Sequence, residues 1–143
     1  MRLDQIAELK ASVESLFSTD LWLDFEVLGY TSLDDGVLTI AASRDFSYYH
    51  NIEIRLKGVK YFSGVFSWKS SPSQNGILLP DGEAGGEHPA DPQSDDIAIC
   101  FVDDDNSRIA VLADSASIDS DTVFYYNKTP LAANERIADW VRR

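Results

Sequence analysis

Two apolar runs in the second half of the chain, separated by one short polar segment, constrain the fold more than any other feature. The runs are IAICFV at 97–102 and RIAVLA at 108–113, and the segment between them is Asp103–Ser107. Each run has the length of a strand, and aspartate, asparagine and serine favour turns. The two runs therefore predict an antiparallel hairpin, and the fully apolar first run is typical of a strand at the centre of a sheet.

Other segments show the two-residue period of a strand with one buried face. In Ile52–Lys57 apolar residues alternate with charged ones, and Leu21–Leu28 alternates in the same way. Turn chemistry at Asp34–Gly36 predicts a second hairpin, between Leu21–Leu28 and the next strand. The remaining strands are predicted at 37–42, at 59–68 with a bend at Gly64, and at 122–126.

Helices are predicted at both ends of the chain. Apolar residues recur every three or four positions in Leu3–Phe17, with charged residues on the other face. Near the C-terminus, Thr129 has the chemistry of a helix N-cap and Pro130 suits the first helical position. We therefore expect one α+β domain over residues 1–143. It would contain a single antiparallel sheet of about six or seven strands, joined mostly by hairpins and flanked by an N-terminal and a C-terminal α-helix.

A long acidic loop at about 67–96 shows no sustained period. It contains four of the five prolines and four of the eight glycines, and loops of this length are mostly functional or disordered. The apolar Ile77–Leu79 is expected to anchor the loop on the body of the protein or to form a brief strand. The acidic residues at the centre of the loop are candidate contacts with a protein partner: Asp81, Glu83, Glu87 and Asp91.

The same loop raises the question of a metal site, because carboxylates are the ligands that calcium and magnesium prefer. The ligand spacing of a calcium loop is absent, and prolines stiffen the chain where it would have to wrap around an ion. His50, His88 and Cys100 do not have a zinc-binding spacing, and Cys100 lies within a predicted strand, where cysteine is normally a small buried apolar residue. The sequence therefore predicts no metal and no other cofactor.

The net charge of −12 arises from 24 acidic residues against 12 lysines and arginines. A strongly acidic protein repels the phosphates of nucleic acids and anionic membranes. The excess is concentrated in residues 70–107, which contain nine acidic residues and no lysine or arginine. The charge therefore predicts a basic protein as partner, and neither a nucleic acid nor a membrane. A purely solubilising role is the alternative.

Aromatic residues are concentrated between Phe46 and Trp68, interleaved with lysines and arginines. Tyrosine, tryptophan and arginine are enriched at protein interfaces, whereas aromatic residues on alternating strands also fill cores. Tyr48 and Tyr49 are adjacent, so in a strand one of them points away from the core. The aromatic candidates for contact with a partner are Tyr48, Tyr49 and Trp68.

No motif for nucleophilic catalysis, phosphate binding or dinucleotide binding occurs, so we do not expect an enzyme. The first residues do not resemble a signal peptide and the single cysteine cannot form an internal disulfide, which favours a cytoplasmic, bacterial-type protein. The leading hypothesis is a non-catalytic protein-binding module of the immunity or neutralising type. One alternative is a self-associating homodimer, and another is a divalent-cation-dependent enzyme that uses the loop carboxylates.

Overall fold

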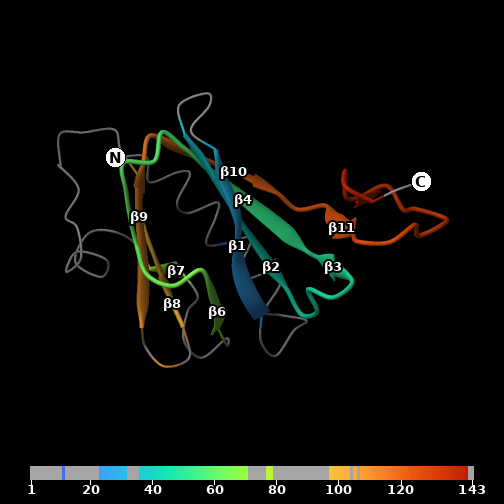
Figure 1. Ribbon diagram of the computed structural model, residues 1–143, viewed down its shortest axis with the longest axis horizontal. Coiled ribbons are helices and arrows are strands. Elements are labelled where there is room, and N and C mark those ends of the chain that lie inside the picture. The colour runs from blue at the N-terminus through green and yellow to red at the C-terminus, as the bar shows by residue number, and fades with distance from the viewer. Residues whose placement is uncertain are drawn as a thin grey trace.

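The computed structural model describes Ala11 and residues 23–31, 36–70, 77–78, 97–103, 105 and 107–141. Within these residues the chain forms twelve strands in three sheets and no continuous helix (Figure 1). The strands are β1 (Leu23–Thr31), β2 (Val37–Ser43), β3 (Tyr49–His50), β4 (Ile52–Lys57), β5 (Tyr61–Ser63), β6 (Ser67–Ser70), β7 (Ile77–Leu78), β8 (Ile97–Val102), β9 (Arg108–Ala113), β10 (Ser115–Asp119), β11 (Thr122–Phe124) and β12 (Glu135–Ile137).

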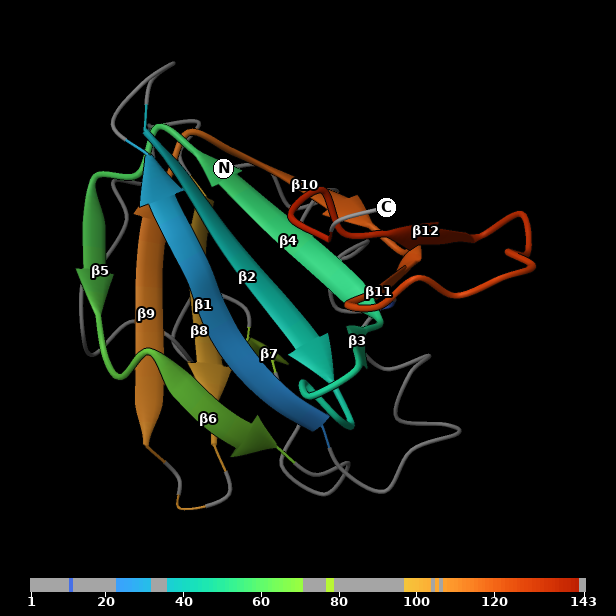
Figure 2. The same ribbon diagram turned by 45° about the vertical axis from the view of Figure 1, so that its right-hand side comes forward.

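Two of the sheets face each other. Sheet A has five strands in the order β10-β4-β2-β1-β6, and sheet C has four in the order β5-β9-β8-β7. Figure 2 shows sheet A lying across sheet C. The rings of Phe25 and Trp68 in sheet A contact Phe101 in sheet C at centroid distances of 5.9 and 5.3 Å. The two sheets therefore form a β-sandwich with the hydrophobic core between them.

The sequence patterns explain which faces are buried. In β4, Ile52, Ile54 and Leu56 are buried in the core, and the two-residue period places Glu53 and Arg55 on the opposite face. All six residues of β8 are buried, and β8 lies between β7 and β9. This position confirms the central strand that its continuous apolar run predicts.

Both predicted hairpins are present. β8 pairs with β9 from Ile97↔Ala113 to Val102↔Arg108, and β1 pairs antiparallel with β2. Two parts of the predicted long loop are strands: β6 lies at the edge of sheet A, and β7 pairs with β8. The brief strand predicted around Ile77 is thereby confirmed, whereas residues 79–96 lie outside the described residues.

The predicted α+β class is wrong. The described residues form three sheets rather than one, and sheet C covers the apolar face of sheet A that helices were expected to cover. More strands form than predicted, because strands as short as β3 and β12 contain too few residues to show a period. The helix predicted at 3–17 lies outside the described residues, apart from Ala11. Among the residues that the structure describes, no helix is long and apolar enough to cross a membrane.

The predicted C-terminal helix is also wrong, because the segment contains β12, which pairs in parallel with β11. Backbone hydrogen bonds join the two strands at both ends: Thr122 N donates to Asn134 O at 2.9 Å, and Ala138 N donates to Phe124 O at 2.8 Å. The carbonyl of Asn134 and the N–H of Ala138 thus form hydrogen bonds between strands instead of hydrogen bonds within a helix. The strands β12, β11 and β3 form sheet B, which lies at one end of the sandwich, on the right in Figure 1.

Gly64, between β5 and β6, has a backbone conformation that other residues rarely adopt. Its φ is +138°, and a Cβ there would lie 2.9 Å from Cγ1 and 3.0 Å from Cα of Ile109. We expect Gly64→Ala to lower the free energy of unfolding by about 1–3 kcal/mol, because it introduces both backbone strain and steric overlap. Urea denaturation measures this change.

Gly29→Ala is the matched control for Gly64→Ala. Gly29 has no positive φ, and nothing lies within 4 Å of its Cβ position. The free energy of unfolding of the Gly29→Ala variant should therefore differ from that of the wild type by less than about 1 kcal/mol. Equal stabilities of the two variants would show that the chain does not need the Gly64 conformation.

Candidate functional site

The outer face of sheet A, opposite the core, carries a row of carboxylates. The register places Glu26 of β1 beside Ala41 of β2, Ala41 beside Glu53 of β4, and Glu53 beside Asp119 of β10. Directly paired residues of neighbouring strands share a face, so the three carboxylates lie on one side of the sheet. Glu53 is buried, and a buried carboxylate requires charged or hydrogen-bonding partners.

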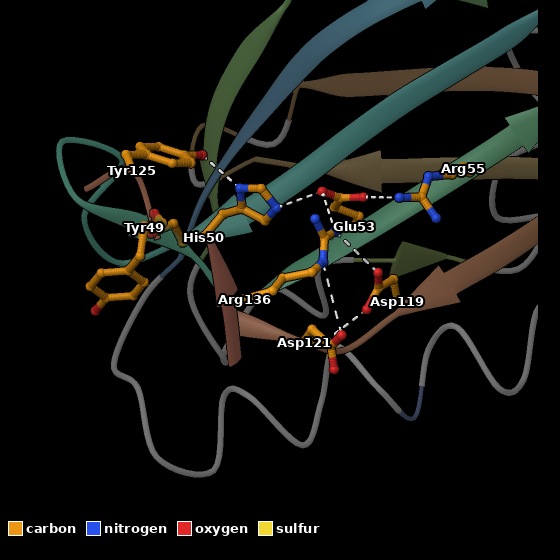
Figure 3. Close-up of polar contacts among 9 residues, drawn as sticks. Tyr49, His50, Glu53, Arg55, Asp119, Asp121, Tyr125 and Arg136 are labelled. Atoms are coloured by element: carbon orange, nitrogen blue, oxygen red, sulfur yellow. Dashed lines mark hydrogen bonds and ion pairs between the residues drawn. The ribbon is translucent and has the colours of Figure 1, made fainter. Parts of the chain in front are cut away.

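Sheet B supplies the first partner of Glu53. His50 lies in β3 and is fully buried. Its Nε2 lies 2.8 Å from Glu53 Oε1, and its Nδ1 lies 2.6 Å from the hydroxyl of Tyr125 (Figure 3). An ionised carboxylate only accepts hydrogen bonds, so Nε2 carries the proton that faces Glu53. In the neutral imidazole, the Tyr125 hydroxyl then donates to Nδ1.

Two arginines complete the surroundings of Glu53. Arg55 of β4 contacts Glu53 Oε2, and Arg136 of β12 donates to Glu53 Oε1 at 3.1 Å. Arg136 also lies 3.2 Å from Asp119 Oδ2 and 3.9 Å from Asp121 Oδ2, as Figure 3 shows. Arg136 thus connects sheet B to two strands of sheet A. We call the connected side chains the Glu53 network: His50, Glu53, Arg55, Asp119, Asp121, Tyr125 and Arg136.

The pKa of Glu53 is lowered from its ordinary value. The hydrogen bond from His50 is the largest cause; burial opposes it, and the positive charges of Arg55 and Arg136 lower the pKa further. Glu53 is therefore ionised at neutral pH. Its negative charge interacts with partners from three different strands, β3, β4 and β12.

The pKa of Tyr125 is raised to about 12, first by burial and then by the negative charges of Glu26 and Glu53. The order hydroxyl, imidazole, carboxylate is the order that activates a nucleophile in hydrolases. Here the phenol keeps its proton at neutral pH, and His50 is fully buried with both ring nitrogens hydrogen-bonded. The geometry therefore favours a structural link between sheets A and B over acid–base chemistry.

Metal binding finds no support in the part of the chain that the structure describes. No group of three or more His, Cys, Asp or Glu side chains there could hold an ion. In the Glu53 network, arginines form ion pairs with the carboxylates, and His50 is hydrogen-bonded to Glu53. Cys100 is buried within β8. The candidate partner contacts of the acidic loop lie outside the described residues: Asp81, Glu83, Glu87 and Asp91.

Exposed aromatic side chains occur in the segments next to the strands of sheet B. Tyr48 and Trp140 are 58% and 65% exposed, and Tyr126 is exposed as well. Tyr48 and Tyr126 contact each other edge to face at a centroid distance of 6.4 Å. Trp140 packs on Tyr125 of the Glu53 network at 5.1 Å. We call Tyr48, Tyr126 and Trp140 the exposed aromatic group.

The three aromatic residues predicted as partner contacts have different surroundings. Tyr48 lies in the turn before β3 and is exposed, whereas Tyr49 lies in β3, is half-buried and packs on Phe124 at 6.1 Å. Trp68 is 6% exposed and stacks on Phe25 with ring centroids 5.4 Å apart. Trp68 therefore belongs to the core and presents little surface to a partner. Contact of Tyr48 and Tyr49 with a partner stays a prediction.

Most of the Glu53 network has no local signal in the sequence. The alternation in β4 places Glu53 and Arg55 on one polar face, and this shared face is the only feature of the network that the sequence pattern predicts. Tyr125 lies 75 positions from His50, and Arg136 lies 83 positions from Glu53. No spacing rule marks contacts over such distances, so only the fold reveals them.

Comparisons with known proteins leave the function to be argued from this geometry. No protein-family model, no curated protein and no solved structure matches the chain. The candidate site therefore consists of the Glu53 network, which joins sheets A and B, together with the exposed aromatic group beside it.

Glu53→Gln removes the charge that Arg55 and Arg136 contact. We expect the free energy of unfolding at pH 7 to fall by about 1–4 kcal/mol, because the variant leaves their charges without a counter-ion; the partial exposure of both arginines limits the loss. Asp114→Asn is the matched control, since Asp114 forms an exposed pair with Lys60 at 3.1 Å. Chemical denaturation should show a change below about 1 kcal/mol for this control.

The two variants should also differ in acid. The lowered pKa of Glu53 means that its contribution to stability is present above the ordinary value of 4.5 and is lost as the pH falls through the lowered pKa. Glu53→Gln should therefore lose less stability than the wild type on acidification, whereas Asp114→Asn retains Glu53 and should retain the loss that Glu53 causes. Parallel pH profiles of Glu53→Gln and wild type would contradict the ionised, buried carboxylate.

The Tyr125 hydroxyl can be followed by ultraviolet titration, because phenolate and phenol absorb differently. The difference between wild type and Tyr125→Phe should show one tyrosine that titrates with a pKa of about 12. Because this pKa is raised, the contribution to stability is fully present below the unfolded value of 10.0 and is lost as the pH rises towards 12. A Tyr125 pKa near the unfolded value in the folded protein would contradict the burial of this hydroxyl beside Glu26 and Glu53.

Proposed function

We propose that this protein is a non-catalytic protein-binding module that covers a basic surface of its partner. The observation that carries the proposal is the exposure of Tyr48, Tyr126 and Trp140 beside the strands of sheet B. Tyrosine and tryptophan are the residues most enriched at binding hot spots, because they bury a large area and lose little side-chain entropy. The exposed aromatic group forms the centre of the proposed contact.

The Glu53 network supports this proposal because it holds the exposed aromatic group in place. Trp140 packs on Tyr125, and the Tyr125 hydroxyl is hydrogen-bonded to the buried His50. The backbone N–H of Tyr125 also donates to the carbonyl of Tyr48 at 2.8 Å. Side chains that are already ordered lose less conformational entropy on association, so this arrangement is preorganised for binding.

Charge indicates the chemistry of the partner. The chain has a net charge of −12, and the exposed Asp139 directly precedes Trp140 in the sequence. Opposite charges on two surfaces accelerate their association and make it sensitive to salt. We therefore propose a protein with a basic surface, met in the cytoplasm, rather than a nucleic acid or a membrane.

The two alternatives have less support. A homodimer would bring two strongly acidic copies together, and Trp68, one of the aromatic residues available to it in the sequence, is buried. A divalent-cation-dependent enzyme would rely on the loop carboxylates, which lie outside the described residues. In the Glu53 network, arginine and histidine contact the carboxylates, and no group of three or more His, Cys, Asp or Glu side chains in the described part of the chain could hold an ion.

The proposal is tested by capture from a native lysate, followed by direct binding measurements. The immobilised full-length protein should retain a basic protein at about 50 mM salt and release it at about 500 mM salt. Mass spectrometry identifies this protein, which is then purified and titrated by calorimetry. Trp140→Ser and Tyr126→Ser should each raise the dissociation constant about fivefold or more, as expected for residues at the centre of an interface.

Val65→Ser is the control for the calorimetric measurements. Val65 is also an exposed apolar residue, but it lies in the connection between β5 and β6. Its replacement should leave the dissociation constant unchanged. Binding that is insensitive to salt, or that Trp140→Ser and Tyr126→Ser do not weaken, would refute the proposed surface. A lysate that yields no basic protein at low salt would refute the function.

A further inference from the structure

A second surface lies at the open side of the sandwich, between β1 of sheet A and β5 of sheet C. An apolar groove of about 320 Å³ is lined there mainly by Tyr30, Leu38, Val59, Phe62 and Phe66; the one charged side chain in its lining is Lys60, which is paired with Asp114 at 3.1 Å. Figure 2 shows β5 at the left edge, beside the last part of β1. Phe66 is 71% exposed, whereas Leu38 is buried and belongs to the core. The groove therefore runs from the surface down to the hydrophobic core.

The walls of this groove are ordered without a ligand. Phe62 and Phe66 are stacked, with ring centroids 6.0 Å apart. Tyr30 forms the opposite wall of the groove. Its hydroxyl lies 2.6 Å from the position that a Cβ at residue 36 would occupy, so any side chain in place of Gly36 would displace the Tyr30 ring. A preformed apolar groove binds a ligand with a smaller entropic cost than a surface that has to rearrange.

Beside the groove lies a part of the β1 edge, residues 28–30, that no described strand pairs with on the side away from β2. β6 pairs with β1 from Leu23 to Glu26, and one more hydrogen bond joins Val27 N to Phe66 O at 2.7 Å. β1 has a bulge between Val27 and Gly29, after which no described strand pairs with it on this side. The segment 28–30 is exposed and contains no charged residue. Exposed edges of this kind pair readily with another strand.

We propose that this edge and groove bind an extended segment of a partner protein, which adds a strand to β1 and inserts apolar side chains between Tyr30 and Phe66. In a strand, every second side chain points the same way, so an alternating segment can fill the groove while its backbone pairs with β1. The other side chains of the segment face solvent and are basic. The net charge of −12 attracts such a segment and repels a second copy of this chain.

This inference goes beyond the proposed function and does not depend on it. The exposed aromatic group would recognise its partner by side chains beside sheet B, whereas the groove would recognise main chain and apolar side chains at the β1 edge. The two surfaces have no residue in common. Each can therefore fail its test without affecting the other.

The test uses a panel of fluorescent peptides of about ten residues in which valine or phenylalanine alternates with lysine. Anisotropy titrations of the full-length protein should show saturable binding. A peptide with proline at its centre should bind about tenfold or more weakly, because proline interrupts strand pairing. A peptide with glutamate in place of lysine should also bind more weakly, because of charge repulsion.

Two protein variants locate the binding site. Phe66→Ser should weaken binding of the lysine peptides about tenfold, since it removes one wall of the groove, and the high exposure of Phe66 limits any effect on folding. Leu131→Ser, which removes an exposed apolar side chain outside both the groove and the exposed aromatic group, should leave this binding unchanged. Hydrogen exchange should slow at the backbone amides of residues 28–30 when peptide is added.

Three results would overturn the inference. The first is the absence of saturable binding by any peptide of the panel at about 1 mM. The second is that the proline peptide binds as tightly as the lysine peptides, or that Phe66→Ser binds the lysine peptides as tightly as the wild type does. Either result would mean that charge attraction alone explains the binding. The third is a wild-type dimer that Phe66→Ser converts to a monomer in analytical ultracentrifugation, because the groove would then be occupied by a second copy.

Discussion

Burial of the apolar face of sheet A against sheet C is the interaction on which the rest of this structure depends. Ile40 and Ile54 of sheet A and Ile99 of sheet C belong to one core cluster. Because side chains alternate along a strand, burial of Ile54 places Glu53 on the opposite face of β4. The row of carboxylates on the outer face therefore follows from the packing of the core.

Glu53 then determines how sheet B is attached. A buried carboxylate is stable only with partners, and Glu53 has them in His50 of β3 and Arg136 of β12, both strands of sheet B. Since Trp140 packs on Tyr125, which contacts His50, the same contacts order the exposed aromatic group. The Glu53 network would thus serve the proposed function by holding the exposed aromatic group in one conformation.

The two proposed surfaces use different physical means of recognition. The exposed aromatic group offers large side chains on an ordered base, so specificity would come from shape and from charge around it. The groove beside β1 offers backbone groups and an apolar recess, so it would recognise an extended chain with alternating residues. The net charge of −12 affects both in the same sense, because it favours basic partners over a second copy of the chain.

The sequence alone determined the strands β4, β8 and β9, the hairpin between the last two, and the acidic character, because periodicity, turn chemistry and charge are local properties. The tertiary structure decided what lies on each face. Thr129 and Pro130 have the local chemistry of a helix start, yet the residues after them form β12, because backbone groups on both sides of it pair with β11. Trp68 resembled an interface residue in the sequence, but sheet C buries it. Glu53 and Arg136, 83 positions apart, meet only when sheet B packs on sheet A, since the burial and partners of a polar group depend on long-range packing.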